Sequence, residues 1–352
     1  MTVLIGETEV RALLSIPVAM DLAEQGYRIF GAERRVVSTP SAAFMIYPGN
    51  GPAPIPRNFW IKGAYSRELG VAGVSLGAQF GEHYFMVVDG VSGGLLGVVE
   101  RSFMSRRRTG ATAGVAARHL ARPDSRVAAL IGAGQIGEQA LRAVAEAFAL
   151  DEFRVASRTL EGAQALVARL QPELATPLRA VASAEEAIRG ADIVVAITVA
   201  QQEFVYPGWL KQGALLLSMG GVAEVAFGVL AECDRLIVDD IDYATLRGDF
   251  AAWIRQGHIR REQIVARLDA DIGEVVCGHK TGRSDPQETI LAVIQGLTIC
   301  DLVAANWLIG AAEKQGIGVN WQVGHASHVQ DAEKLARDSI RIAQSLQPAA
   351  KG

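Results

Sequence analysis

Residues 126–137 have the sequence RVAALIGAGQIG, in which an apolar run ends at three glycines spaced as GxGxxG. The run at 126–132 shows no polar alternation, which is typical of a strand buried on both faces of a parallel sheet. Apolar residues then recur at helical spacing, and these are Ile136, Ala140, Leu141, Val144 and Phe148. The stretch therefore predicts a strand, a glycine turn and an amphipathic helix.

Short apolar runs recur after this unit, and helix-forming segments separate most of them. The runs lie at 152–156, 192–199, 214–219, 235–239 and 289–294, and the helical segments include 160–170 and 184–189. Strands that alternate with helices predict right-handed crossovers and a doubly wound parallel sheet. With the run at 126–132 they make six strands, enough for a complete Rossmann domain.

The first 120 residues follow a different pattern, with one long helix followed by short strands. We expect the helix at 8–31, and Gly, Pro and Asn punctuate the strands that follow it. The expected strands are 42–47, 57–65, 71–80, 84–89 and 95–101. A helix of small residues at 110–121 would connect this region to the strand at 126–132.

These two patterns predict an α/β protein of two domains. Residues 119–302 are expected to form the Rossmann domain, with its doubly wound parallel sheet. Residues 1–118 and 303–352 are expected to form a smaller α+β domain. Helices at 297–316 and 331–346 would return the chain to that domain after the sixth strand.

The composition describes a soluble globular protein, since half of the 352 residues are hydrophobic and a fifth are charged. The 34 Lys and Arg residues and 38 Asp and Glu residues give a net charge of -4. Nucleic acids and anionic membranes require clustered positive charge, and the basic run Arg106–Arg108 is short. We therefore expect neither as a partner.

Cysteine spacing and hydropathy indicate the cellular compartment in which the protein is expected. The three cysteines are far apart and form no CxxC pair, so neither a structural metal nor a disulfide framework is expected. No apolar run reaches the roughly 18 residues of a membrane span. Glu7 and Glu9 interrupt the region where a signal peptide would be apolar. A reducing cytoplasm is the expected location.

The glycine turn indicates a dinucleotide site because it follows a predicted strand and opens a predicted helix. Gly132 permits the tight turn, Gly134 lets the backbone approach a pyrophosphate, and Gly137 allows close helix–strand packing. The helix that starts with Gln135 and Ile136 supplies N–H groups and the positive end of its dipole to the phosphates. The alternative is a glycine turn that binds nothing.

The end of the second strand bears on which nicotinamide cofactor is used. NAD sites usually place an acid there for the ribose, whereas NADP sites need hydroxyl or cationic groups for the 2′-phosphate. Here Ser157, Arg158 and Thr159 follow the strand, and no acid occurs until Glu161. This favours NADP(H). Arg158 as a solvated loop residue is the alternative, and Glu161 would favour NAD(H) if the strand ended two residues later.

Two cations in the first domain are candidates for substrate binding. Lys62 interrupts the apolar run FWIKG at 59–63, so it lies either on the outward face of a strand or buried beside an anion. Arg108 precedes the helix expected at 110–121. By itself it is typical of the end of a basic surface loop, although a guanidinium there would suit bidentate recognition of a carboxylate.

The order of these motifs along the chain resembles the ornithine cyclodeaminase/mu-crystallin family. The resemblance extends from about residue 6 to 316. It is carried by Lys62, MVVDG at 86–90, RTGA at 108–111, GAGQIG at 132–137, IGEVVCGHKTGR at 272–283 and GLTICD at 296–301.

The resemblance implies a homodimer in which the first domain binds substrate and mediates dimerisation. Family enzymes interconvert L-amino acids with imino or keto acids by means of a nicotinamide cofactor. By position, Lys62 and Arg108 match family residues at the substrate carboxylate, and Thr109 matches a threonine near the cofactor phosphate. The strand ends at Thr198, Val199, Met219 and Gly220 join the expected cofactor-binding residues.

Two departures from the family pattern affect the expected reaction. Cyclodeaminases have Gly-Gly-Asp where this chain has Gly220, Gly221 and Val222, so the proton-handling carboxylate is absent from its place. Pro40 is followed by Ser-Ala-Ala at 41–43 instead of an arginine, so one carboxylate clamp is also absent.

We therefore expect an NAD(P)H-dependent oxidoreductase that acts on the C–N bond of an α-imino or α-amino acid. A lysine, Glu224 or water would handle the proton, although Glu224 by itself is typical of a solvated loop acid. One alternative is an ornithine cyclodeaminase. Another, of a different class, is a cofactor-linked binding protein without turnover.

Overall fold

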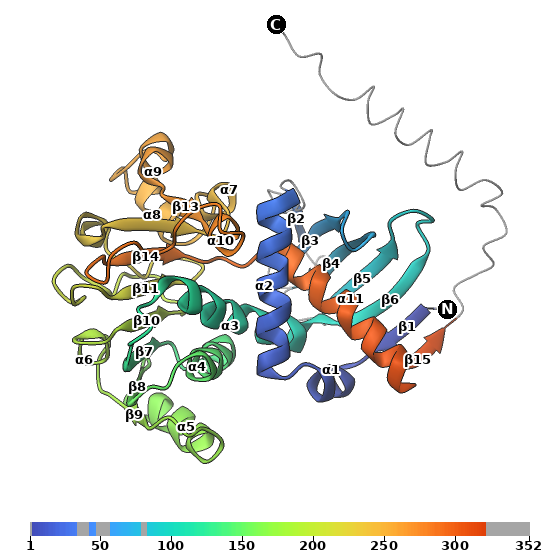
Figure 1. Cartoon of the computed structure of the whole chain (residues 1–352), viewed down its shortest axis with the longest axis horizontal. Coiled ribbons are helices and arrows are strands. Elements are labelled where there is room, and N and C mark those ends of the chain that lie inside the picture. The colour runs from blue at the N-terminus through green and yellow to red at the C-terminus, as the bar shows by residue number, and fades with distance from the viewer. Residues whose placement is uncertain (1, 34–41, 47–56, 79–82, 322–352) are drawn as a thin grey trace, which may run out of the picture.

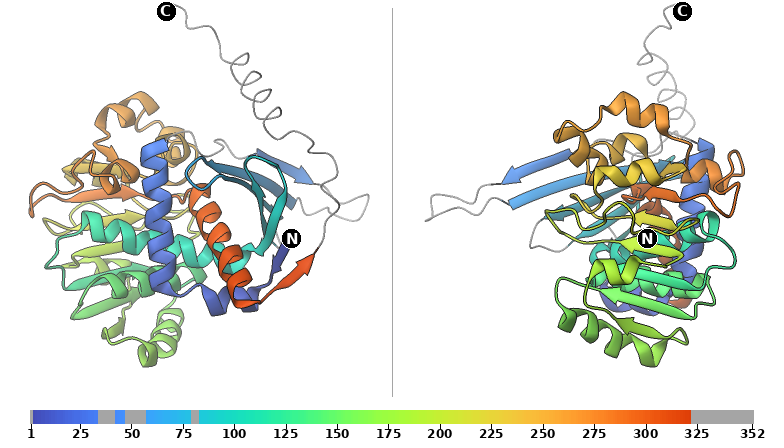
Figure 2. Two further views of the ribbon diagram at one scale, coloured as in Figure 1. Left: turned by 45° about the vertical axis from the view of Figure 1, so that its right-hand side comes forward. Right: turned by 90° about the vertical axis from the view of Figure 1, so that its left-hand side faces the viewer.

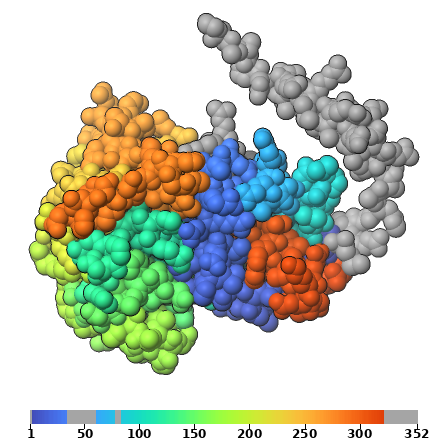
Figure 3. All heavy atoms as spheres, viewed as in Figure 1, coloured from blue at the N-terminus to red at the C-terminus, as the bar shows by residue number. Residues whose placement is uncertain are grey.

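The computed structural model describes residues 2–33, 42–46, 57–78 and 83–321. Within these residues the chain forms two sheets, and α2 (Ile16–Glu33) runs between them (Figures 1 and 3). The helix expected at 331–346 lies outside the described residues. In the part of the chain that is described, no helix has both the length and the apolar character needed to cross a bilayer.

Seven of the described strands form the first sheet, which is mainly antiparallel. Their spatial order is β15 (Val319–Trp321), β1 (Thr2–Ile5), β6 (Leu95–Glu100), β5 (Tyr84–Asp89), β4 (Val71–Ala78), β3 (Arg57–Ser66) and β2 (Ala42–Ile46). Only β1 and β6 pair in parallel among these described strands. Helix α11 (Thr298–Gln315) packs against one face of this sheet (Figure 2).

Eight described strands form the second sheet, and all of their pairings are parallel. Their order is β13 (Ala270–Asp271), β12 (Arg235–Val238), β14 (Ile290–Val293), β11 (Leu215–Ser218), β10 (Ile193–Ala196), β7 (Val127–Ile131), β8 (Glu152–Ala156) and β9 (Leu178–Ala180). This is the expected doubly wound Rossmann sheet. The edge strands β9 and β13 were not expected, because three and two residues make no apolar run.

The remaining described helices surround these sheets. They are α1 (Glu7–Leu13), α3 (Arg101–Leu120), α4 (Gln135–Ala147), α5 (Leu160–Leu170), α6 (Ala184–Ile188), α7 (Ile241–Ala244), α8 (Gly248–Arg255), α9 (Arg261–Arg267) and α10 (Ile272–Val276), with 3-10 turns η1 (Gln171–Glu173) and η2 (Phe227–Glu232). Strand β7 is buried on both faces as predicted: Leu130 joins one apolar cluster and Ala129 the other.

Two helices differ from the sequence prediction for local reasons. The helix expected at 8–31 is two helices, because Pro17 in the first turn of α2 cannot continue a helix that includes Leu13. The helix expected at 110–121 already begins at Arg101, where the Glu100 carboxylate accepts hydrogen bonds from the N–H groups of Ser102 and Phe103 at 2.5 and 3.1 Å. Arg108 therefore lies in the middle of α3.

The close packing of α3 on α4 depends on small residues. A Cβ atom at Gly110 would overlap with the side chain and backbone of Gln139, and one at Gly114 would lie 2.7 Å from the carbonyl oxygen of Ala143. These glycines let the two backbones approach, and so fix α3 against the helix that follows the glycine turn.

Replacing Gly110 by alanine is predicted to destabilise the protein by about 1–3 kcal/mol, because the added methyl group overpacks this contact. Gly310→Ala is the matched control, since Gly310 also lies in a helix but has no atom of the described part of the chain within 4 Å of the place that a Cβ atom would take. There alanine should raise stability by about 0.5–1 kcal/mol. Chemical denaturation measures both changes, and equal effects would contradict this packing account.

Candidate active site

The glycine turn has the geometry that its sequence predicts. Gly132 has a φ of +122°, and a Cβ atom there would overlap with the carbonyl oxygen of Ile197. A Cβ atom at Gly137 would overlap with the Gly132 carbonyl oxygen. Gly134 caps α4 without a side-chain hydrogen bond, and no atom of the described residues lies within 4 Å of its Cβ position. The turn is thus tightly packed at Gly132 and Gly137 and open at Gly134.

Open space lies at the start of α4, where a phosphate would meet the helix dipole. Gln135 is exposed and Ile136 half-buried in this first turn. The Gln135 side chain accepts a hydrogen bond of 2.8 Å from Nη1 of Arg106. Thr109 is half-buried on α3 next to Gly110, which packs on α4, so a second helix brings residues to this turn.

The second strand, β8, ends at Ala156 as expected. Arg158 is exposed and forms no ion pair with any residue that the structure describes, while Ser157 beside it is half-buried. Thr159 caps α5 by accepting a hydrogen bond of 3.2 Å from the N–H of Gly162. Glu161 lies in the first turn of α5 and not at the strand end. The side chains nearest the strand end are therefore one guanidinium, of Arg158, and two hydroxyls, of Ser157 and Thr159.

Lys62 connects the two sheets. Its ammonium on β3 donates a hydrogen bond of 2.8 Å to Oη of Tyr243 on α7, the helix that follows β12 of the Rossmann sheet. Both side chains are half-buried. Lys62 therefore does not point outward into solvent, and it forms no ion pair with a carboxylate of any residue that the structure describes.

Two cations surround the Tyr243 hydroxyl. Burial by itself would raise the pKa of Tyr243, but the charges of Lys62 and Arg247 outweigh it and lower the pKa below its usual value. Arg247 also packs on Gly221, where a Cβ atom would lie 2.5 Å from Nη2 of the guanidinium. Tyr243 and Arg247 belong to no sequence motif, so neither is predicted from the sequence.

Arg108 is buried, so its interpretation as the end of a surface loop is wrong. Its Nε and Nη2 donate to the two carboxylate oxygens of Asp301 on α11 at 2.7 and 2.9 Å. Arg101 donates to Asp301 as well, at 3.1 Å. Burial would raise the pKa of Asp301, but the two guanidinium groups outweigh it and lower the pKa.

One nitrogen of Arg108 remains for another ligand. Nη1 is buried and has no hydrogen-bond partner among the described residues. It lies 2.7 Å from the Cβ position of Gly296, in the turn between β14 and α11. Bidentate recognition of a carboxylate is therefore observed, but the carboxylate is the protein's own.

Glu224 is buried, with 2% of its surface exposed, so its interpretation as a solvated loop acid is wrong. One oxygen accepts a hydrogen bond from the N–H of Thr198, and the other accepts one of 2.8 Å from the N–H of Gly220. These residues follow β10 and β11. Burial raises the pKa of Glu224 to about 7, although the N–H donors oppose this.

A second buried carboxylate supports this loop. Asp249 on α8 accepts hydrogen bonds from the N–H groups of Glu224 and Val225 at 2.6 and 3.0 Å, and from the hydroxyl of Ser218. Burial raises the pKa of Asp249. Sequence reasoning missed Asp249, because a single acid in a helix gives no signal of its partners.

The predicted cofactor residues gather at one edge of the Rossmann sheet. The glycine turn follows β7, Ser157 to Thr159 follow β8, Thr198 and Val199 follow β10, and Met219 and Gly220 follow β11. Thr198 is half-buried, Val199 is 86% exposed, and Met219 and Gly220 are buried. The carboxyl ends of strands are where open α/β sheets bind ligands.

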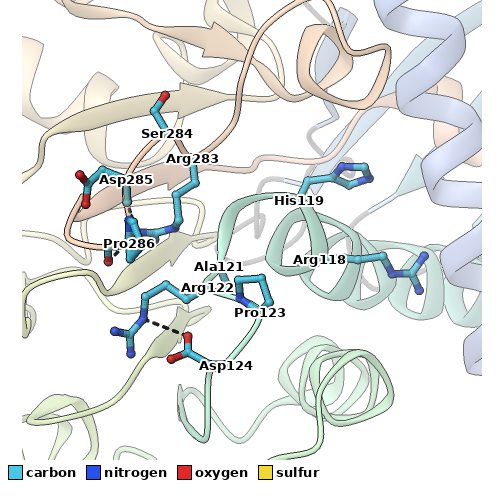
Figure 4. Close-up of a pocket in the computed structure, with 10 residues that line it drawn as sticks. All are labelled: Arg118, His119, Ala121, Arg122, Pro123, Asp124, Arg283, Ser284, Asp285 and Pro286. Carbon is cyan, nitrogen blue, oxygen red and sulfur yellow. Dashed lines mark hydrogen bonds and ion pairs between the residues drawn. The ribbon is translucent and has the colours of Figure 1, made fainter.

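A pocket of about 540 Å³ lies elsewhere (Figure 4). It is formed by the end of α3, residues 121–124 before β7 and residues 283–286 before β14, at the amino ends of these strands. Its arginines make structural contacts: Nε of Arg283 donates to the Leu120 carbonyl oxygen at 2.8 Å, and Arg122 pairs with Asp192. This pocket is therefore not the predicted cofactor site.

Comparisons with known proteins show sequence similarity over much of the chain. A model of the ornithine cyclodeaminase/mu-crystallin family matches residues 73–316. Delta(1)-pyrroline-2-carboxylate reductase of Bacillus cereus is 29% identical over 238 residues, which are 66% of this chain and 72% of the relative. Ketimine reductase mu-crystallin of Rattus norvegicus is 28% identical over 220 residues, 62% of this chain and 66% of the relative.

Solved structures share the fold. Thermococcus litoralis Delta(1)-pyrroline-2-carboxylate reductase, in complex with NADH and L-proline, superposes with a TM-score of 0.80 at 23% identity, covering 91% of this chain and 100% of that one. An archaeal alanine dehydrogenase dimer with bound NAD gives a TM-score of 0.79 at 23% identity, covering 92% and 99%.

The raised pKa of Glu224 predicts a pH-dependent contribution to stability. Because the pKa rises from 4.5 to about 7 on folding, the contribution is complete below pH 4.5 and is lost as the pH rises through 7. At 1.36 kcal/mol per pKa unit, wild type should lose about 3 kcal/mol over this range relative to Glu224→Gln. Urea unfolding at several pH values measures this. Parallel pH profiles for the two proteins would contradict the burial account.

Proposed function

The chain belongs to the ornithine cyclodeaminase/mu-crystallin family, and we propose that it reduces the C=N bond of an α-imino acid with a nicotinamide cofactor. One observation carries the proposal: Lys62 reaches from the first sheet to Tyr243 at the carboxyl ends of the Rossmann strands. A small molecule bound at those strand ends would therefore meet a cation from the other sheet. The names of the pyrroline-2-carboxylate and ketimine reductase relatives support the same reaction class.

The residues present fit a dinucleotide. When bound, its reduced nicotinamide supplies a hydride. The open space above Gly134 lets the pyrophosphate approach the start of α4. Glu224 holds the N–H groups of Thr198 and Gly220 together, and so sets the spacing of the two loops that would flank the nicotinamide.

We propose that NADP(H) is preferred over NAD(H). Arg158 is exposed beside Ser157 and Thr159, and Glu161 is in α5 away from the strand end. A guanidinium and hydroxyl groups suit a 2′-phosphate, whereas no carboxylate is placed for a free ribose hydroxyl among the described residues at this strand end. The solved relatives carry NADH or NAD, so cofactor choice is a property to be measured on this chain.

The substrate carboxylate would be held by Lys62 and by Nη1 of Arg108. Nη1 is the one nitrogen of that guanidinium without a described partner, since Nε and Nη2 bind Asp301. Asp301 thus orients Arg108, and holding the carboxylate places the α-carbon at a fixed point. Lys62 and Arg108 are proposed to act as binding groups and not as proton carriers.

Cyclodeamination is the weaker candidate. It needs a group that moves protons at the reacting amine, and Val222 occupies the place of the family aspartate. Glu224, two residues later, has both oxygens occupied by backbone N–H groups. Simple imine reduction makes smaller demands on proton transfer.

We further propose a homodimer. Strand β15 is an edge strand of the first sheet, and Val319 and Trp321 on it are 64% and 52% exposed. Apolar side chains at an exposed edge favour association with a second copy.

Purified protein is predicted to oxidise NADPH in the presence of a cyclic α-imino acid such as Δ1-pyrroline-2-carboxylate, or of pyruvate with ammonia. Loss of absorbance of the reduced cofactor measures the rate, and chromatography identifies the amino acid product. NAD with ornithine should yield neither proline nor ammonia. If NADPH binds and no imino acid in the panel consumes it, the proposal of turnover fails.

Arg158→Ala is predicted to raise KM for NADPH about tenfold or more and to leave KM for NADH within about twofold. The reason is the loss of one charge-assisted contact, worth about 1.5–3 kcal/mol, to the 2′-phosphate. Arg255→Ala is the control, since Arg255 is an exposed arginine on α8, in the part of the chain that forms the Rossmann sheet. Equal changes for both cofactors would contradict the proposed NADP(H) preference.

A further inference from the structure

We propose that Tyr243 donates the proton to the substrate nitrogen in this reduction. The inference rests on the proposed function and names the group that completes it. Reducing a C=N bond requires a proton at nitrogen as well as a hydride at carbon. Val222 supplies none, and Tyr243 is the hydroxyl group that Lys62 contacts.

The carboxyl groups at this edge of the sheet are occupied by backbone donors. Both oxygens of Glu224 accept N–H groups. Asp249 accepts two N–H groups and a hydroxyl. Asp239 accepts the N–H of Gly296 at 2.5 Å, and Asp240 caps α7. These acids fix loops and turns. Burial raises the pKa of Glu224 to about 7, but both of its oxygens are taken by the backbone N–H groups of Thr198 and Gly220.

The Tyr243 hydroxyl lies where β3 of the first sheet meets α7, the helix that follows β12 of the Rossmann sheet. Its oxygen accepts a hydrogen bond of 2.8 Å from Nζ of Lys62. Because Lys62 only donates, the hydroxyl proton of Tyr243 points to another acceptor. A substrate carboxylate held by Lys62 would place the adjacent C=N group beside that hydroxyl.

Arg247 lies between the Tyr243 hydroxyl and the loop at Gly220 and Gly221, which is proposed to flank the nicotinamide. Its guanidinium packs on Gly221, directly after Gly220 at the end of β11. It is also close enough to Tyr243 to lower the pKa of the phenol. Tyr243 therefore lies between Lys62, which is proposed to bind the substrate, and Arg247, which contacts the loop proposed to flank the nicotinamide.

The charges around Tyr243 favour release of its proton. Lys62 on β3 and Arg247 after α7 are positive and together lower the pKa of the phenol against the effect of burial. On its own helix, Asp242 is exposed and pairs with Arg261 on α9. Asp240 accepts the backbone N–H of Tyr243 at 3.3 Å and is held at the helix cap.

The proposed step is balanced. The α-carbon gains the hydride, the π electrons of the C=N bond move to nitrogen, and nitrogen takes the proton of the Tyr243 hydroxyl. The O–H bond breaks, and the resulting phenolate is stabilised by Lys62 and Arg247 until water returns the proton. NADPH is the reductant, as in the proposed function, and no other co-reactant is required.

Tyr243→Phe tests this step on the full-length protein with NADPH and Δ1-pyrroline-2-carboxylate. The variant should lower kcat at least about 100-fold and keep KM for NADPH within about threefold. Wild-type kcat should fall at high pH as the phenol ionises. The pH profile of the variant should lack this high-pH limb, that is, the decrease of kcat at high pH. A group that only positioned Lys62 would change KM for the imino acid and leave the high-pH limb in place.

Tyr206→Phe is the matched control, since the exposed Tyr206 also makes one hydroxyl hydrogen bond, to the Glu203 carbonyl oxygen at 2.8 Å. Its kinetics should match wild type. NADPH titration by fluorescence checks that Tyr243→Phe is folded.

Two results would overturn the inference while leaving the proposed function intact: kcat within about threefold of wild type, or an unchanged high-pH limb. If Glu224→Gln and not Tyr243→Phe removed turnover, Glu224 would be the donor instead. Failure of the wild type to oxidise NADPH would refute the proposed function itself.

Discussion

The buried carboxylate of Asp301 holds together the two helices that connect the sheets. Helix α3 links β6 to β7, α11 links β14 to β15, and Arg101 and Arg108 on α3 both donate to Asp301 on α11. Removing one partner from a buried ion pair leaves an uncompensated charge, at a cost of about 3–5 kcal/mol. The relative position of the sheets, and with it the contact of Lys62 with Tyr243, depends on this cluster.

Local patterns predicted the Rossmann half of the fold, whereas contacts between distant residues could not be predicted. The glycine turn and six strands follow from short-range sterics and hydropathy. The bond of Arg108 to Asp301 joins residues 193 positions apart, and that of Lys62 to Tyr243 joins residues 181 apart. A single sequence gives no signal for such pairs. For the same reason Glu224, typical of a loop acid by sequence, is buried.

The site illustrates how chemistry varies on one scaffold. In this chain the fold brings Lys62 of the first sheet to Tyr243 on the helix that follows β12. In this chain the loop acid Glu224 holds the strand ends, supported by Asp249, while Val222 replaces the family aspartate. The proposed proton donor is the phenol of Tyr243, which lies between the cations Lys62 and Arg247. Positioning and proton transfer are thus assigned to different residues.

A crystal structure of the protein with NADP⁺ and L-proline would show directly which group the reacting nitrogen faces. We expect the nicotinamide between the loops at Thr198 and Gly220 and the carboxylate at Lys62 and Nη1 of Arg108. The ring nitrogen should lie within hydrogen-bond distance of Oη of Tyr243. A nitrogen that instead faces Glu224, or an amino acid bound away from Lys62, would contradict this expectation.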